Sequence, residues 1–154
     1  MKRDPRLRGL SSDHHRALVL ARRVARRAAA GTLDPALAQD VLRSLRDDLE
    51  PHFVIEEEVL LPALENAGAG GLARRTLEDH GFLKASARAA AGGALEHLAA
   101  FAERLASHVR FEEQELFPAC EEKLSDAVLE EVARRAPHPP TGPSQVRSVT
   151  PGPR

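Results

Sequence analysis

Two short stretches of this chain each place a histidine and a glutamate four residues apart. In HFVIEEEVLLP these are His52 and Glu56, and in HVRFEEQELFP they are His108 and Glu112; a proline follows each glutamate by six residues. Residues four apart lie on one face of an α-helix, so each pair can point at a single spot. Neutral imidazole and carboxylate are natural ligands of iron, manganese and zinc. The two pairs therefore predict a metal site.

Both pairs fall on the apolar faces of their predicted helices, where leucine or valine would pack better. A buried carboxylate without a partner is strongly destabilising, and a bound metal ion removes that cost. Histidines also fall on the apolar faces of the other two predicted helices. Two metal ions could then share two bridging glutamates and take two histidines each. The six predicted ligands are His14, His52, Glu56, His80, His108 and Glu112. Asp13 and Asp79 are possible orienting groups for metal-bound histidines. Glu57 and Glu58 should point off the apolar face of their helix and take no part in metal binding.

The first helix offers two neighbouring candidates for its ligand. His14 lies in line with Ala17 and Ala21, whereas His15 lies in line with Arg22, which should face water. We favour His14 as the ligand and keep His15 as the alternative, with a surface role if His14 binds the metal.

The elements that must position these residues are four long helices. The chain is rich in alanine and leucine and only 3% aromatic, which favours helix over strand. Apolar residues spaced three and four apart predict helices over residues 11–30, 35–65, 72–91 and 94–122, with a short fifth helix after Ser125. Ser11 or Ser12 should cap the first helix and Asp34 the second. Short connections predict an all-α, up-down-up-down four-helix bundle.

Prolines and composition set the remaining boundaries. Pro62 and Pro118 each remove a helical hydrogen bond, so each should kink or end its helix. Residues 137–154 hold six of the 11 prolines and almost no large apolar groups, which is typical of a disordered tail. We therefore predict a bundle domain over residues 1–136 and a Pro-rich disordered tail over residues 137–154.

Charge and cysteine content narrow the function classes. The net charge of −1 gives no overall attraction to nucleic acid or to a membrane. The single cysteine excludes an internal disulfide, and the chain has no apolar run long enough to span a bilayer. We expect a cytoplasmic protein whose partner is a small molecule, with no nucleic acid and no membrane partner.

The ordered set of motifs resembles the hemerythrin-like, or HHE cation-binding, family. A histidine on the first helix, H-x-x-x-E with a later proline on the second, DH on the third and H-x-x-x-E again on the fourth together cover about residues 10–122. The resemblance implies a four-helix bundle around a non-haem di-iron centre, two iron ions with an oxo or hydroxo bridge. The E-x-x-H motif of ferritin-like di-iron proteins is absent from the sequence.

One position departs from the family's oxygen carriers. Those members have a fifth histidine one turn after the histidine of the third helix, and this chain has Lys84 there. We expect a di-iron protein that binds oxygen or a related small oxidant, or that senses or handles iron. Two alternatives stay open: a di-iron enzyme acting on peroxide or nitric oxide, and a metal-stabilised interaction or signalling module.

Overall fold

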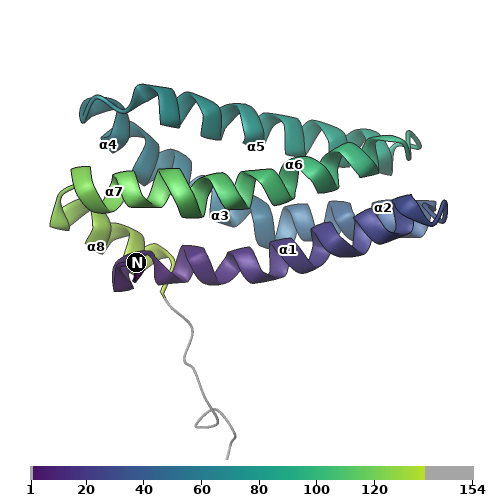
Figure 1. Cartoon of the computed structure of the whole chain (residues 1–154), viewed down its shortest axis with the longest axis horizontal. Helices are drawn as coiled ribbons and strands as arrows, with labels where there is room; N and C mark the ends of the chain where they lie inside the picture. Colours follow the sequence, from purple (N-terminus) through teal and green to yellow (C-terminus); the bar gives the residue numbers. More distant parts are fainter. Residues whose placement is uncertain (1, 138–154) are drawn as a thin grey trace, which may run out of the picture.

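The computed structural model describes residues 2–137, and every regular element in that range is helical. Four long helical runs alternate in direction along an elongated molecule and are joined by short connections (Figure 1). A shorter fifth helix follows and packs against the start of the chain. The predicted all-α, up-down-up-down bundle with an extra C-terminal helix is confirmed.

The four runs are built from the following elements. The first is α1 (Arg8–Ala29), preceded by the short 3-10 turn η1 (Pro5–Leu7). The second is continuous and comprises α2 (Pro35–Ser44), η2 (Leu45–Leu49), α3 (Glu50–Ile55), η3 (Glu56–Leu60) and α4 (Leu61–Asn66). The third is α5 (Gly70–Ala91). The fourth comprises α6 (His97–Phe111), η4 (Glu112–Leu116) and α7 (Phe117–Lys123), and α8 (Asp126–Arg135) follows it.

Two of the predicted helix starts are confirmed by their capping hydrogen bonds. The Asp34 carboxylate accepts from the amide of Leu37 at 2.8 Å, and the Ser125 hydroxyl accepts from the amide of Val128 at 3.3 Å. Side-chain oxygens at these positions satisfy amides that have no partner within the helix. These two caps fix the start of the second run and of α8.

The start of the first helix was predicted wrongly. Ser11 and Ser12 lie inside α1 and do not cap it, because helical structure already begins at η1, where Asp4 accepts from the amide of Arg6. Leu7 is fully buried in this early turn, and η1 packs against α8. Burial against a distant helix therefore extends the first run. The fourth run also differs, since α6 begins at residue 97 and not at residue 94.

Three π-helical turns lie within the long runs, and each is followed two residues later by a proline. In η3, for example, the amide of Leu61 bonds to the carbonyl of Glu56, five residues back, and Pro62 comes next. The same arrangement precedes Pro118 and Pro51. A proline has no amide hydrogen and its ring crowds the carbonyl four residues back, so the wider turn accommodates it. Neither Pro62 nor Pro118 ends its helix, contrary to the termination that we considered.

The apolar core is divided into two clusters. One occupies the end of the bundle where α1 passes into α2 and includes Val24, Val41, Leu83 and Phe101. The other lies beside α8 and includes Leu60, Leu116, Phe117 and Leu129. The buried polar residues of the bundle belong to neither cluster and include two glutamates that are 0% exposed. Such a layer inside an otherwise apolar core needs a chemical reason.

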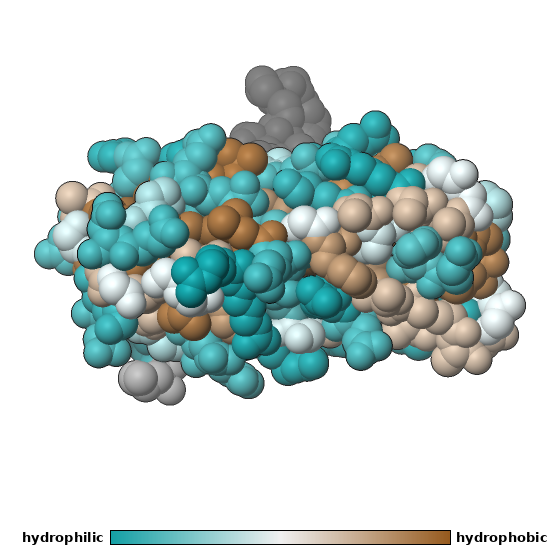
Figure 2. Space-filling view, turned by 90° about the horizontal axis from the view of Figure 1, so that it is seen from above, coloured by the Kyte–Doolittle hydropathy of each residue, from teal (hydrophilic) through white to brown (hydrophobic). Residues whose placement is uncertain are grey.

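Small side chains cover part of the surface. On the face seen in Figure 2, weakly hydrophobic residues gather toward the end where α5 turns into α6, and hydrophilic residues dominate the other end. Between α1 and α6 lies a groove of about 630 Å³, lined largely by alanines such as Ala21, Ala25 and Ala102. None of the six predicted ligands lines this groove.

From residue 138 onward the predicted tail lies outside the described residues, and the domain boundary after residue 136 stays a prediction. Among the residues described, none of the helices is both long and apolar enough to cross a membrane.

Candidate metal centre

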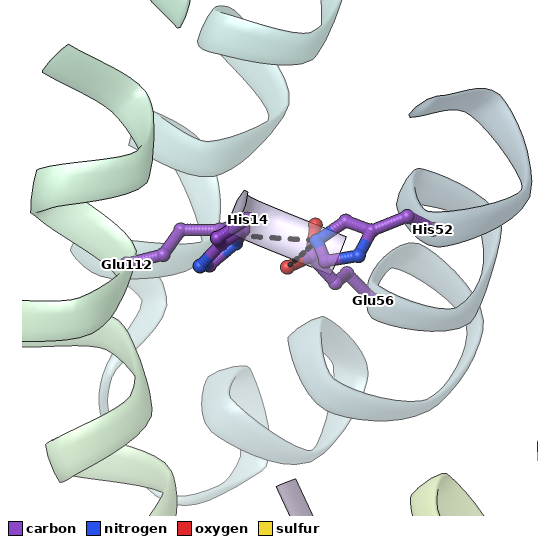
Figure 3. A group of neighbouring side chains, drawn as sticks. All are labelled: His14, His52, Glu56 and Glu112. Atoms are coloured by element: carbon purple, nitrogen blue, oxygen red, sulfur yellow. Dashed lines mark hydrogen bonds and ion pairs between the residues drawn. The ribbon is translucent and has the colours of Figure 1, made fainter. Parts of the chain in front are cut away.

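The structure brings the six predicted ligands together in the middle of the bundle, between the two apolar clusters. All six are buried, with exposed fractions of at most 5%. Figure 3 shows His14, His52, Glu56 and Glu112 converging from three of the helical runs. His80 on α5 and His108 on α6 complete the set from the opposite side. Each of the four helical runs thus contributes at least one side chain.

The ligand atoms form two groups that share both glutamates. His14 and His52 make one group with Glu56 and Glu112, and His80 and His108 make the other with the same two glutamates. Within each group the nitrogen and oxygen atoms lie within 4.8 Å of one another. Every inward ring nitrogen is close to a glutamate oxygen: His14 Nε2 to Glu112 Oε1 at 2.8 Å, His52 Nε2 to Glu56 Oε2 at 3.1 Å, His80 Nε2 to Glu56 Oε1 at 3.0 Å, and His108 Nε2 to Glu112 Oε2 at 3.1 Å.

Most of these inward atoms lack hydrogen-bond geometry despite the short distances. The unpartnered atoms are Nε2 of His52, His80 and His108, both carboxylate oxygens of Glu56, and Oε2 of Glu112. Each unmade hydrogen bond of a buried polar atom costs on the order of 1–3 kcal/mol. Nitrogen and oxygen lone pairs that face a shared point without bonding to each other are what a cation needs. The residues present therefore fit a metal-binding site.

A second layer of carboxylates holds the outer nitrogen of every histidine. Each Nδ1 lies at hydrogen-bond distance from a carboxylate oxygen: His14 from Glu113 at 2.6 Å, His52 from Asp13 at 3.0 Å, His80 from Glu57 at 2.6 Å, and His108 from Asp79 at 2.9 Å. When Nδ1–H donates to a carboxylate, Nε2 keeps its lone pair for a metal. The carboxylates thereby fix both the tautomer and the orientation of the rings.

Sequence reasoning found only half of this second layer. Asp13 and Asp79 were predicted as possible orienting groups, and each contacts a ligand histidine. Glu57 does lie off the apolar face of its own helix, as predicted, but its carboxylate accepts from His80 on the neighbouring α5, a contact that the sequence did not indicate. Glu113 was missed in the same way. The available signal was the doubled glutamate, since both motifs read H-x-x-x-E-E.

The ion pairs inside this cluster shift the pKa values of its members. Burial alone would lower the pKa of His52, but Glu56, Asp13 and Glu112 outweigh burial and raise it well above its usual range. The same balance, with Glu112 as the main partner, raises the pKa of His108 to about 10. Burial would raise the pKa of Glu112, yet the histidines around it hold that pKa well below its ordinary value. Protons and metal ions therefore compete for the same nitrogens.

A small cavity of about 10 Å³ lies against the cluster. Three of the ligand histidines line it together with Asp13 and with the apolar side chains of Ala17, Leu49, Phe53, Leu105 and Val109. A volume of this size corresponds to roughly one water-sized sphere. The site therefore has room for a very small molecule beside the histidines, in a mainly apolar setting.

The structure also shows where His15, the alternative ligand of the first helix, and Lys84 lie relative to the ligand groups. His15 is exposed and lies outside both ligand groups, whereas its neighbour His14 is buried among them. Lys84 is half-buried on α5, one turn beyond His80, and is not a member of either group. Among residues 2–137 we find no hydrogen bond or ion pair of the Lys84 ammonium.

A helical bundle whose core holds a layer of histidines and shared glutamates is a candidate metalloprotein of the four-helix class. Comparison with protein families matches residues 7–120 to the hemerythrin HHE cation-binding domain. The chain belongs to this family. Searches of curated proteins and of solved structures each gave no significant match.

Proposed function

We propose that this chain is a non-haem di-iron protein that binds oxygen or a related small oxidant, or that senses or handles iron. The observation that carries the proposal is the pair of ligand groups that share Glu56 and Glu112. One ion alone would use at most one of these groups and would leave the imidazoles of the other unsatisfied. Two carboxylates common to both groups suit bridges between ions a few ångströms apart.

Iron is favoured by ligand chemistry and by the family together. Imidazole and carboxylate without thiolate suit iron, manganese or zinc, and the only cysteine, Cys120, is buried and is in neither ligand group. Membership of a cation-binding family with hemerythrin in its name favours iron among the three. Two iron ions held by these residues would supply the electrons that a reaction with a small oxidant requires.

The second layer and the cavity support a small ligand. Four carboxylates at Nδ1 orient the imidazoles so that each Nε2 faces the shared glutamates, where it could bind a metal ion. The small, mainly apolar cavity suits oxygen, peroxide or nitric oxide better than any large substrate. We therefore propose a small molecule as the partner, and neither nucleic acid nor a membrane.

Metal analysis and an optical spectrum of iron-reconstituted protein test the proposal. We expect about two irons per chain, as two shared carboxylates require, and a spectrum that reports an oxo or hydroxo bridge. A firm value of one or zero after anaerobic reconstitution would contradict a dinuclear centre.

Rapid mixing of the reduced, iron-loaded protein with oxygen, peroxide or nitric oxide then separates the possible roles. A reversible spectral change supports binding or sensing, and repeated consumption of the oxidant supports an enzyme. If none of the three changes the spectrum, the iron has a structural role and the chain is better described as a metal-stabilised interaction module.

A further inference from the structure

The bundle is built from two corresponding halves. The Asp13–His14 pair of α1 corresponds to Asp79–His80 of α5, and the H-x-x-x-E-E motif of the second run corresponds to that of the fourth run. The contacts correspond too, because each aspartate orients the motif histidine of its own half. A difference between equivalent positions of the two halves can therefore indicate a difference in what the two halves do.

One such difference concerns access from the surface to the centre. In the first half a surface pocket of about 270 Å³ is lined by Asp47 and Asp48 of η2 and by Arg16 of α1. Its inner wall includes Asp13 and the ligand His52, and the C-terminal end of α8 forms another side. The small cavity beside the cluster shares Asp13 and His52 as lining residues. The pocket and that cavity therefore meet at these two residues.

The equivalent pocket of the second half does not reach the centre. It has about 250 Å³ and is lined by Glu103 and Arg104, which stand where the first half has Asp47 and Asp48. Phe82, the counterpart of Arg16, lines it as well. The Arg104 guanidinium donates to Asp79 at 3.1 Å and stacks over the Phe82 ring at 4.1 Å. Neither Asp79 nor a ligand histidine lines this pocket, so Arg104 blocks the way inward.

The charges of the open pocket favour a cation. Both arginines on its wall are occupied, since Arg16 pairs with Asp13 and Arg135 pairs with Glu58. Asp47 and Asp48 have no hydrogen bond or ion pair with any other part of residues 2–137. Two uncompensated carboxylates in a hollow attract a divalent cation and raise its local concentration. The same carboxylates give no advantage to a neutral molecule.

We infer that this pocket is the access route by which divalent metal ions reach the centre, and that the route exists on one side of the bundle only. Asp47 and Asp48 attract the ion at the surface, and the Asp13–His52 pair passes it inward to the ligand groups. Arg104 blocks the corresponding position on the other side. The inference rests on the proposed metal centre, because the route has meaning only if an ion is bound at its end.

Rates of metal uptake by the full-length metal-free protein test the route. Fe²⁺ is added anaerobically by rapid mixing, and the fall in free Fe²⁺ is followed with a chromophoric chelator. Asp48→Arg gives the first half an arginine at the position that Arg104 occupies in the second half. Asp47→Arg reverses the charge at an exposed position, where the change should not affect folding. Glu103→Arg is the matched control, since it makes the same change at the exposed counterpart of Asp47.

We expect both aspartate variants to take up Fe²⁺ about tenfold or more slowly than the natural protein. The control should take it up at the natural rate. All four proteins should reach the same final metal content, because none of the changed residues is a ligand. Added salt should slow uptake by the natural protein and affect the Asp47→Arg variant less, since screening weakens only the attraction that is still present.

Two outcomes would overturn the inference. Equal uptake rates in all four proteins would mean that metal enters elsewhere, and equal slowing by Glu103→Arg would mean that overall charge, and not this pocket, governs the rate. Failure of the proposed function is distinguishable from both, because the natural protein would then hold no stoichiometric metal at any time.

Discussion

Glu57 offers the sharpest test of the second layer, because it was expected to face away from the site. Its Oε2 lies 2.6 Å from His80 Nδ1, and its side chain is 30% exposed. A hydrogen bond to a charged group contributes about 1.5–3 kcal/mol. Since water can reach Glu57 and replace part of this bond, we take the lower half of that range, which corresponds to about a tenfold to fortyfold loss of metal affinity in Glu57→Ala.

The matched control is Glu58→Ala, one residue along the same helix. Glu58 pairs with Arg135 at the surface and its side chain is 60% exposed, so its loss should leave metal affinity unchanged. Competition with a chelator of known Fe²⁺ affinity measures the metal affinity of both variants. Glu57→Gln keeps an acceptor oxygen but loses the charge. Its metal affinity should therefore lie between those of the natural protein and the alanine variant. If Glu57→Ala and Glu58→Ala bind metal equally well, the orienting role assigned to Glu57 is wrong.

Three further predictions follow from the centre itself. Glu56→Ala should lose at least one metal ion per chain while keeping its helical circular dichroism, because both ligand groups use Glu56; an unchanged metal content would show that it is no bridge. Lys84→Ala should leave the metal content unchanged, as metal analysis can check, since a protonated amine cannot coordinate a metal ion. In the metal-free protein the pKa of His108 is about 10 when folded and about 6.5 when unfolded, so protonation of His108 stabilises the fold. This stabilisation is fully present below about pH 6.5 and should be lost as the pH rises through about 10. Urea unfolding of metal-free protein at pH 7 and pH 10 measures that loss, and metal-loaded protein, in which the metal replaces the proton, should show less of it.

Much of the bundle was predictable because it depends on local rules. Apolar spacing placed the four long runs, and the caps at Asp34 and Ser125 followed from residues that satisfy free amides at helix starts. All six ligand candidates came from the same spacing, because a polar residue on an apolar helix face is costly to bury unless something binds it. What these rules describe is one helix at a time.

The features that were missed depend on two helices at once. Glu57 lies off the apolar face of its own helix, and only the position of α5 beside it makes it a partner of His80. The early start of the first run depends on burial of Leu7 beside α8, about 120 residues further along the chain. The π turns before the prolines are also absent from simple helical patterns, which assume one fixed number of residues per turn.

The crosswise supply of ligands has a consequence for how the two halves of the chain depend on each other. Each ligand group takes three side chains from its own half and one glutamate from the other, and His14 and His80 are each oriented by a glutamate of the opposite half. A fragment ending at Asn66 would hold an incomplete version of either position. If the chain were cut in the connection at Gly68, bound metal would join the two peptides in addition to the apolar clusters, and a chelator would weaken their association.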